Sequence, residues 1–184
     1  MTNKIGRKIL LAAARKTIEL SLNGKRPYWR DVLPSGTDIP EGNGGAFVTL
    51  KKHGDLRGCI GRLQSEEPIA KTVSEMAYAA AFEDPRFPPL VSGELNDILI
   101  EISRLSDFFP IKAEEVEVGK HGLMLRVGYL SGLLLPQVPI EQGWSKSEYL
   151  AGLCRKAGLP VGSWDHPDAE FLAFTAEVFS ENEM

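Results

Sequence analysis

The sequence has few of the residues that mark a secreted, membrane-spanning or metal-binding protein. Its 184 residues include two cysteines and three histidines. Cys59 and Cys154 do not have the spacing of a metal-ligand pair, and two cysteines make no disulfide framework. No apolar run approaches the roughly 20 residues that a membrane span needs, and the first residues lack the apolar core of a signal peptide. We therefore expect a cytoplasmic protein with reduced thiols, no metal site and no membrane contact.

Positive charge is also scarce for a protein that binds nucleic acid. Lysine and arginine together number 21 against 25 acidic residues, which gives a formal net charge of -4. A phosphate backbone favours clustered basic residues, so nucleic acid is not an expected partner. With 43% hydrophobic residues, the chain is long enough for one well-filled core.

Familiar catalytic and cofactor motifs are missing as well. The chain has no Walker loop, no G-x-G-x-x-G after a predicted strand, no G-x-S-x-G elbow and no H-E-x-x-H helix. The cofactor therefore stays unknown from the sequence, and a site has to be sought in less common patterns.

The most unusual stretch is the hexapeptide 56–61, Leu-Arg-Gly-Cys-Ile-Gly. It follows an apolar run over 46–50 and a His-Gly-Asp turn signal, so we expect it to be the return strand of a hairpin. Two glycines weaken a strand unless something needs the space. Because side chains alternate along a strand, Arg57 and Cys59 should share one face and form a small polar site beside bare backbone.

Cys59 is the candidate nucleophile of this site. A reactive thiol needs nearby positive charge, access and a base. Arg57 can supply the charge, and His121, at the start of a later strand, can supply the base if the two hairpins meet. The alternative is a small cysteine in a tight strand, with Arg57 paired to Glu101 or Asp84.

Hydrophobic periodicity and turn signals predict helices and strands in mixed order. The expected elements are a helix over 3–22, a hairpin of 46–52 with 56–63, a helix opening at 65–68, a strand over 97–105, a hairpin of 123–127 with 133–135 turned at 128–132, a helix from 145 to 156 and a closing strand over 169–179. The hairpins and the late strand favour an α+β fold with a mostly antiparallel, mixed sheet flanked by helices. Cys154 is expected to be a small buried hydrophobe on the last helix.

Two carboxylate positions need compensation. An acidic pair ending in Asp84 closes the second predicted helix and opposes its dipole, so Arg86 or Arg57 is expected as an ion-pair partner. Glu101 lies on a strand that is predicted to be central in the sheet. It therefore needs a partner, because an unpaired buried carboxylate is costly. Arg57 and Arg104 are the candidates for its partner.

The hexapeptide 56–61 resembles the signature of the AMME chromosomal region gene protein family, whose domain is called AMMECR. Further similar blocks follow in order over 45–50, 80–89, 119–123, 132–138 and 153–159. The similarity covers roughly residues 5 to 180, so the resemblance extends over one AMMECR-type domain spanning 1–184.

The resemblance implies an α+β fold with a larger sheet-and-helix subdomain, which holds both termini, and a smaller lobe. It implies that the signature residues line a groove between the two. The candidate site residues are then Arg57, Gly58, Cys59, Asp84, Arg86, His121 and Gln137. Microbial members resemble component A of a system that also has a Memo-like protein and a radical-SAM protein, which are the expected partners. The resemblance names no reaction, substrate or cofactor.

Three functions remain open at this point. The first is a small-molecule-binding protein or enzyme, with Cys59 as reactive thiol, Arg57 as anion clamp and His121 as proton carrier. The second is a non-catalytic module that docks on Memo-like or radical-SAM proteins through an exposed apolar patch. The third is nucleic-acid binding, against which the net charge argues.

Overall fold

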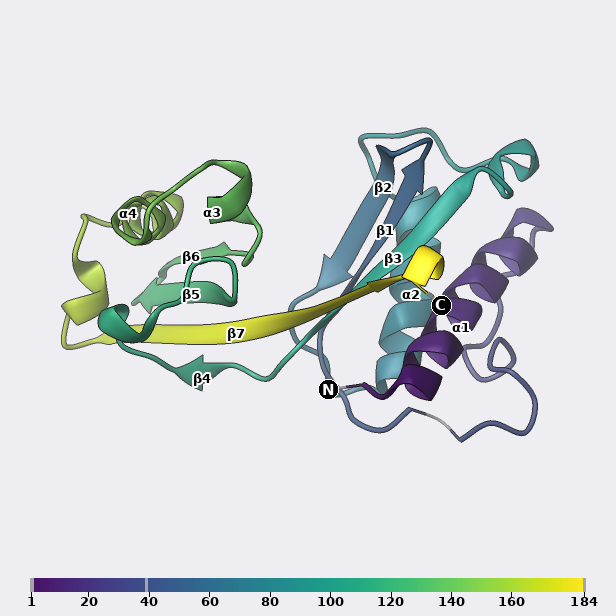
Figure 1. Ribbon diagram of the computed structural model, residues 1–184, viewed down its shortest axis with the longest axis horizontal. Helices are drawn as coiled ribbons and strands as arrows, with labels where there is room; N and C mark the ends of the chain where they lie inside the picture. The colour runs from purple at the N-terminus through teal and green to yellow at the C-terminus, as the bar shows by residue number, and fades with distance from the viewer. Residues whose placement is uncertain (1, 39, 184) are drawn as a thin grey trace. The chain divides into compact units, whose positions relative to one another are not determined.

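The computed structural model describes residues 2–38 and 40–183, which form two compact units (Figure 1). The first unit comprises Met1–Leu105 and Glu177–Met184, and the second comprises Ser106–Ala176. Strand β7 (Ala169–Ser180) contributes residues to both units. The strand pairs are antiparallel and helices pack on the strands, so the predicted α+β class is confirmed.

In the first unit, two helices pack on an antiparallel sheet (Figure 1). The helices are α1 (Lys4–Leu22) and α2 (Ile69–Phe82), and the strands are β1 (Ala46–Lys52), β2 (Asp55–Arg62) and β3 (Ile98–Leu105). The strand order β2-β1-β3 places β2 at the edge of the sheet. These bounds lie close to the predicted ones because strong periodicity and turn residues mark each element.

The core of this unit lies between the sheet and the two helices. Every second residue of β3, from Ile98 to Ile102, is buried together with Leu50 of β1 and residues of α1 and α2. Strand β3 has a neighbouring strand on each side, as its apolar pattern predicts. Leu50, Ile100 and Ile102 are fully buried, each contributing about 1.5–3 kcal/mol by leaving water.

The partner of Glu101 differs from the prediction. Lys51 on the adjacent strand donates to its carboxylate at 2.9 Å. Arg104 instead donates to the Thr2 hydroxyl and to a backbone carbonyl. Cross-strand neighbours decide such pairs, and the sequence shows them only after the register is known.

The second unit contains a small sheet with a helix against it. Its elements are β4 (Phe109–Pro110), β5 (His121–Val127), β6 (Leu130–Leu134), α3 (Val138–Glu141), α4 (Lys146–Ala157) and the first part of β7. Helix α4 begins at the capping box of Ser145 and ends at Gly158, which has a left-handed φ of 74°, as predicted. Cys154 on α4 is fully buried, which confirms its prediction as a small hydrophobe.

The turn of the β5–β6 hairpin is shorter than predicted. The prediction placed Gly128 through Gly132 in the turn, but β6 already begins at Leu130 and Gly132 lies within it. A Cβ at Gly132 would lie 2.6 Å from the backbone nitrogen of Ala157. This glycine therefore serves close packing of α4 on β6, which a local turn signal cannot distinguish.

None of the helices in the described part of the chain is both long and apolar enough to span a membrane. Short 3-10 helices complete the connections, at Ser92–Glu94, Ala113–Glu115, Ser163–Asp165 and Glu181–Glu183.

Candidate functional site around Cys59

Cys59 lies on β2, at the edge of the sheet of the first unit. Its opposite residue in β1 is Thr49, whose hydroxyl oxygen is 3.1 Å from Cys59 Sγ. An edge strand presents backbone N–H and C=O groups that no further strand can satisfy. The two outward backbone groups of Cys59 therefore need partners from outside the sheet.

Asp84 and Arg86, in the loop after α2, supply both partners. The Cys59 N–H donates to Asp84 Oδ2 at 2.8 Å, and Arg86 Nη2 donates to the Cys59 carbonyl at 3.1 Å. Arg86 also donates to Asp84 through Nε at 3.0 Å and Nη2 at 2.8 Å. We call Cys59, Asp84 and Arg86 together the Cys59 clamp. At Cys59 it makes the two backbone hydrogen bonds that a further strand would otherwise make, and so it fixes the backbone of this residue.

The clamp joins a buried carboxylate to an exposed guanidinium. The side chain of Asp84 is 2% exposed and that of Arg86 is 55% exposed. The hydrogen bonds from Arg86 hold the pKa of the Asp84 carboxyl well below its usual range, although burial acts in the opposite direction. The Cys59 N–H adds to this lowering. The prediction that Arg86 compensates the carboxylate at the end of α2 is confirmed.

Arg57 has a different environment from the one predicted. The β1–β2 register shifts between Leu50 and Lys51, so Arg57 has no opposite residue in β1. Such a bulge interrupts the alternation of side chains that would place Arg57 and Cys59 on one face. The two residues have different hydrogen-bond partners: Arg57 pairs with Glu94, whereas Asp84 and Arg86 hold the backbone of Cys59. That Arg57 and Cys59 form one polar site stays a prediction.

The partner of Arg57 is Glu94, which the sequence did not indicate. Arg57 donates to Glu94 through Nε at 3.0 Å and Nη2 at 2.9 Å, and Lys52 donates at 3.0 Å. Hydrogen bonds from Arg57 and then Lys52 lower the pKa of Glu94 to about 2, against the effect of burial. Arg57 Nη1 is buried and makes no hydrogen bond to the described residues. The expected pairing of Arg57 with Glu101 or Asp84 is thus corrected.

Glu94→Gln should change the acid limb of the stability profile. The pKa of Glu94 is lower in the folded state, so its contribution is fully present above about 4.5 and is lost as pH falls toward about 2. At pH 7 we expect the variant to lose about 1–3 kcal/mol, because two cations lose their charged acceptor. Urea denaturation between pH 2 and 7 measures both effects.

Glu141→Gln is the control for Glu94→Gln. Glu141 is exposed and forms no ion pair within the described part of the chain. Its substitution should leave stability within about 0.5 kcal/mol at every pH. Equal profiles for the two variants would contradict the importance assigned to the Arg57–Glu94 pair.

Other parts of the protein occupy the space beside the two glycines of the hexapeptide. A Cβ at Gly58 would lie 2.2 Å from the Ala80 carbonyl oxygen on α2. At Gly61 a Cβ would overlap the ring of Phe47 on β1. Other parts of the protein therefore need the space at both glycines, which is the condition under which glycines were expected in this strand. The two glycines allow α2 and an aromatic ring to approach the strand closely.

Three residues near the site escaped prediction: Thr49, Glu94 and Phe87. The ring centroid of Phe87 is 6.0 Å from the guanidinium carbon of Arg57 and 5.6 Å from that of Arg86. Phe87 therefore lies beside both guanidinium groups, within the range of cation–π contact. Its place directly after Arg86 was an available signal, but Glu94 lies in a short 3-10 helix that no motif marks.

His121 and Gln137 belong to the second unit. His121 is buried, and its Nδ1 accepts the Glu117 N–H at 3.1 Å. Burial, followed by the charge of Lys120, lowers the pKa of His121, so the ring is neutral at pH 7 with its proton on Nε2. Nδ1 can act as a base only if it gives up that hydrogen bond. Gln137 is exposed and precedes α3 without a capping side-chain bond.

Two surface hollows of the first unit lie away from the hexapeptide. One, of about 570 Å³, is lined by residues around the start of α1 together with Arg104. The other, of about 430 Å³, lies by α1, α2 and the segment 26–29. Over residues 2–38 and 40–183, no group of three or more histidine, cysteine or acidic side chains is placed to hold a metal ion.

Comparison with known proteins places this chain in a family. A family model described as AMMECR1 matches residues 11–179. Protein MK0488 of Methanopyrus kandleri is 46% identical over 149 residues, which cover 76% of this chain and 72% of that protein. A protein of Methanosarcina acetivorans is 40% identical over 193 residues, which cover 100% of this chain and 94% of that protein.

A solved structure agrees with the fold as well. The crystal structure of the uncharacterized protein PH0010 from Pyrococcus horikoshii is similar at a TM-score of 0.75 and 38% identity. The match covers 94% of this chain and 89% of that one. None of these three proteins is named for an activity. They therefore show the family and the fold of this chain, and its chemistry follows from the site alone.

Proposed function

Since this chain belongs to the AMMECR1 family, we propose that it acts through the Cys59 thiol, as a small-molecule-binding protein or a thiol-dependent enzyme with its site around the hexapeptide 56–61. The observation that carries the proposal is the Cys59 clamp. A buried carboxylate and a guanidinium fix both backbone groups of Cys59, while the residue stays partly exposed at the sheet edge. A reactive thiol needs this combination of fixed position and access.

Arg86, rather than Arg57, is the cation assigned to the thiol. Both arginines pair with a carboxylate through Nε and Nη2, Arg57 with Glu94 and Arg86 with Asp84. They differ in that Arg57 Nη1 is buried, whereas Arg86 is half-exposed and also donates to the carbonyl of Cys59 itself. The exposed guanidinium of Arg86 can therefore receive an anionic ligand beside the sulfur.

Thr49 is the polar partner of the sulfur. Its hydroxyl lies 3.1 Å from Sγ and can donate to a thiolate or accept from a thiol. The role of His121 as proton carrier stays a proposal: as the ring is held, Nε2 can donate its proton, while Nδ1 accepts the Glu117 N–H. In this scheme Cys59 attacks or binds the ligand, Thr49 orients the sulfur, and Arg86 holds negative charge.

Alkylation of Cys59 by iodoacetamide tests the assignment of Arg86. Arg86→Gln should slow the reaction at pH 7 by roughly 5-fold, which corresponds to about 1 kcal/mol of charge interaction at the surface. Arg86→Lys should restore most of the rate because the charge is kept. Mass spectrometry of the peptide containing Cys59, with Cys59→Ser as the blank, gives the rate.

Arg57→Gln is the matched control for this prediction. Unlike Arg86, Arg57 makes no hydrogen bond to Cys59 within the described part of the chain, so we expect less than about a twofold change in the rate at Cys59. An effect of Arg57→Gln equal to that of Arg86→Gln would contradict the assignment of Arg86 to the thiol.

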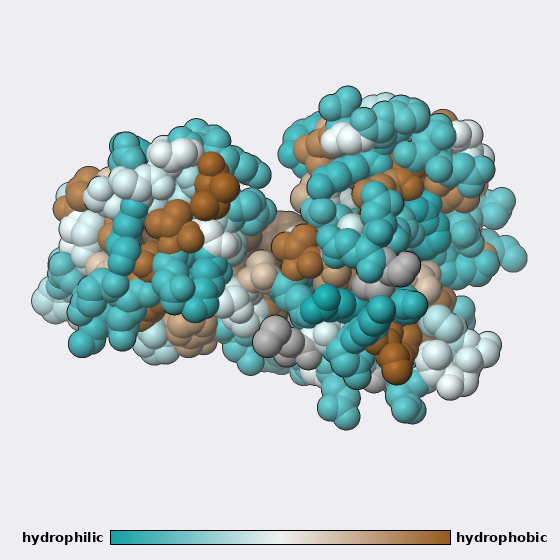
Figure 2. Space-filling model, in the orientation of Figure 1, coloured by the Kyte–Doolittle hydropathy of each residue, from teal (hydrophilic) through white to brown (hydrophobic). Residues whose placement is uncertain are grey.

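Docking on Memo-like or radical-SAM proteins is less well supported. Exposed apolar side chains occur at separate places, including Val91 in the first unit and Tyr129 and Val161 in the second. On the face in Figure 2, hydrophobic residues form separate patches among hydrophilic ones. A docking surface would instead gather them in one patch with a polar rim.

A further inference from the structure

The hollow of about 430 Å³ in the first unit is lined by aromatic and charged side chains. It lies where the segment 25–31, directly after α1, meets α2. Its lining includes Arg26, Tyr28, Trp29, Lys71, Glu75 and Tyr78. A hollow of this size suits one small ligand, since ligand pockets run from about 300 to 1,000 Å³. No residue of the Cys59 clamp contributes to it.

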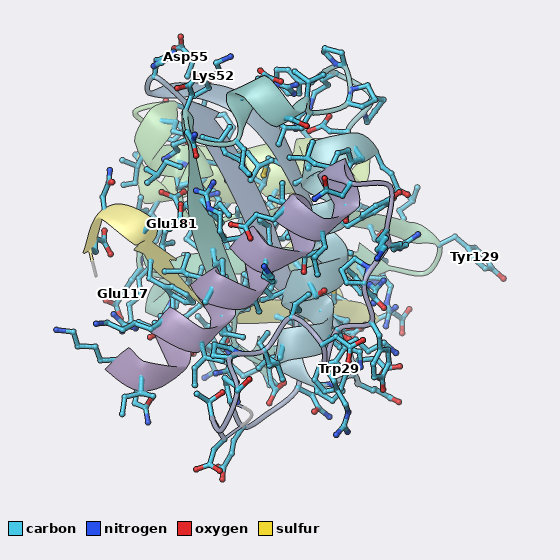
Figure 3. All side chains as sticks on the ribbon, turned by 90° about the vertical axis from the view of Figure 1, so that its right-hand side faces the viewer. Trp29, Lys52, Asp55, Glu117, Tyr129 and Glu181 are labelled. Carbon is cyan, nitrogen blue, oxygen red and sulfur yellow. The ribbon has the colours of Figure 1, made fainter. Side chains whose placement is uncertain are left out.

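Tyr28 offers an exposed ring at the mouth of this hollow. Its side chain belongs to a residue that is 57% exposed, whereas Trp29 is 8% exposed and packs into the core. Their ring centroids are 6.0 Å apart and the ring planes are tilted by 55°, so the exposed ring contacts an indole that is anchored in the core. Figure 3 marks Trp29 on the loop after α1. A large exposed aromatic ring on an anchored base is a platform for stacking.

The same segment carries cations that have no hydrogen-bond acceptor. Lys25, Arg26 and Arg30 are exposed, and their side chains make no hydrogen bond within the described part of the chain. Arg26 stacks on Tyr78 at 4.2 Å, and Arg30 lies 4.8 Å from the ring of Trp29. Both guanidinium groups are thus held beside the aromatic rings.

Nearby carboxylates compensate only part of this charge. Glu75 is bound to Arg62 at 3.2 Å, and Glu67 is bound to Lys71 at 2.8 Å. Glu83 lies 3.9 Å from Arg26, beyond hydrogen-bond distance, and Asp31 is exposed. The three cations of the segment 25–31 therefore exceed its one carboxylate.

From this combination we propose that the hollow binds a nucleotide unit, with its base stacked on Tyr28 and its phosphate held by Arg26 of the lining and by Arg30, which lies outside the lining beside the ring of Trp29. An aromatic platform flanked by exposed guanidinium groups, of which Arg26 has only a 3.9 Å contact with Glu83, recognises a planar base joined to an anion, and the stacking tolerates any base. The net charge of -4 argues against a broad basic surface, and it is compatible with one local site. The ligand is either a free mononucleotide or one residue of a single-stranded nucleic acid.

Titrations with AMP and with a labelled single-stranded oligouridylate distinguish these sources. Binding of both assigns a mononucleotide site, and binding of the oligouridylate alone assigns a nucleic-acid site. Tyr28→Ala should raise the dissociation constant about 5- to 150-fold by removing the stacking surface. For the oligouridylate, Arg26→Gln with Arg30→Gln should also reduce the salt dependence, by about 0.7 in the log–log slope for each phosphate that an arginine no longer neutralises.

Tyr129→Ala is the matched control for Tyr28→Ala. Tyr129 is a fully exposed tyrosine in the β5–β6 turn of the second unit, and Figure 3 shows it projecting from the ribbon. Its removal should leave binding unchanged, and circular dichroism checks that each variant is folded. No binding of either ligand by the wild-type protein, or equal binding by folded Tyr28→Ala, would overturn the proposal.

Discussion

Asp84→Asn is expected to lower the free energy of unfolding by about 3 kcal/mol, although the side chain keeps its size. Oδ1 of Asp84 accepts from the Arg86 N–H and Nε, and Oδ2 accepts from the Cys59 N–H and Arg86 Nη2. An asparagine amide group would place N–H donors against two donors in either orientation. The buried Cys59 N–H or the Arg86 guanidinium would therefore lose its acceptor.

Glu83→Gln is the control for this prediction, one residue earlier in the chain. Its side chain is half exposed, and its contact with Arg26 is 3.9 Å long, so we expect a change within about 0.5 kcal/mol. Urea denaturation at pH 7 compares the two variants with the wild type. A loss below about 1 kcal/mol for Asp84→Asn would contradict the structural role of the clamp.

Lowering the pH should remove the stabilisation that the Asp84 carboxylate gives the wild-type protein. Because the clamp lowers the folded-state pKa of Asp84, its stabilisation is fully present above the unfolded value near 3.8 and declines as pH falls below it. Asp84→Asn should lack this decline, so the wild-type and variant curves should converge toward low pH.

Gly58→Ala is expected to destabilise the protein by about 3 kcal/mol, at the upper end for overpacking. The new Cβ would lie 2.2 Å from the backbone carbonyl oxygen of Ala80, and neither backbone can turn aside as a flexible side chain would. Relief requires α2 to move away from β2, which loosens the packing of the buried face of α2.

Gly93→Ala provides the comparison for Gly58→Ala. Gly93 is exposed, nothing lies within 4 Å of the added Cβ, and its φ is not left-handed. We expect this variant to be neutral or up to about 1 kcal/mol more stable, because alanine restricts the unfolded chain. Equal stability of the two alanine variants would contradict the claim that close packing requires a glycine at position 58.

Local signals predicted most of the first unit and of α4. The capping box of Ser145, the left-handed Gly158 and the apolar alternation of 98–102 each act over a few residues. Such signals operate within one element, so they predict its bounds without any knowledge of the fold. The pairing of Asp84 with Arg86 is local in the same sense.

The site could be predicted only in part because its geometry depends on distant contacts. Arg57 and Glu94 are 37 positions apart, and the β2 bulge that redirects Arg57 leaves no mark in the alternation of residue types. Likewise, the role of Gly58 depends on the Ala80 carbonyl of another element. Local patterns therefore could not identify Glu94 as the partner of Arg57 or Ala80 as the neighbour of Gly58.

The rate at which iodoacetamide modifies Cys59 in the folded wild-type protein tests the central claim most directly. It should be measured at pH 7 against a free cysteine peptide, with buried Cys154 as the internal unreactive thiol. A thiol that acts in binding or catalysis should react several-fold faster than the peptide. Reaction at or below the rate of the peptide would contradict a functional thiol. The clamp would then serve only to hydrogen-bond the backbone at the edge of the sheet.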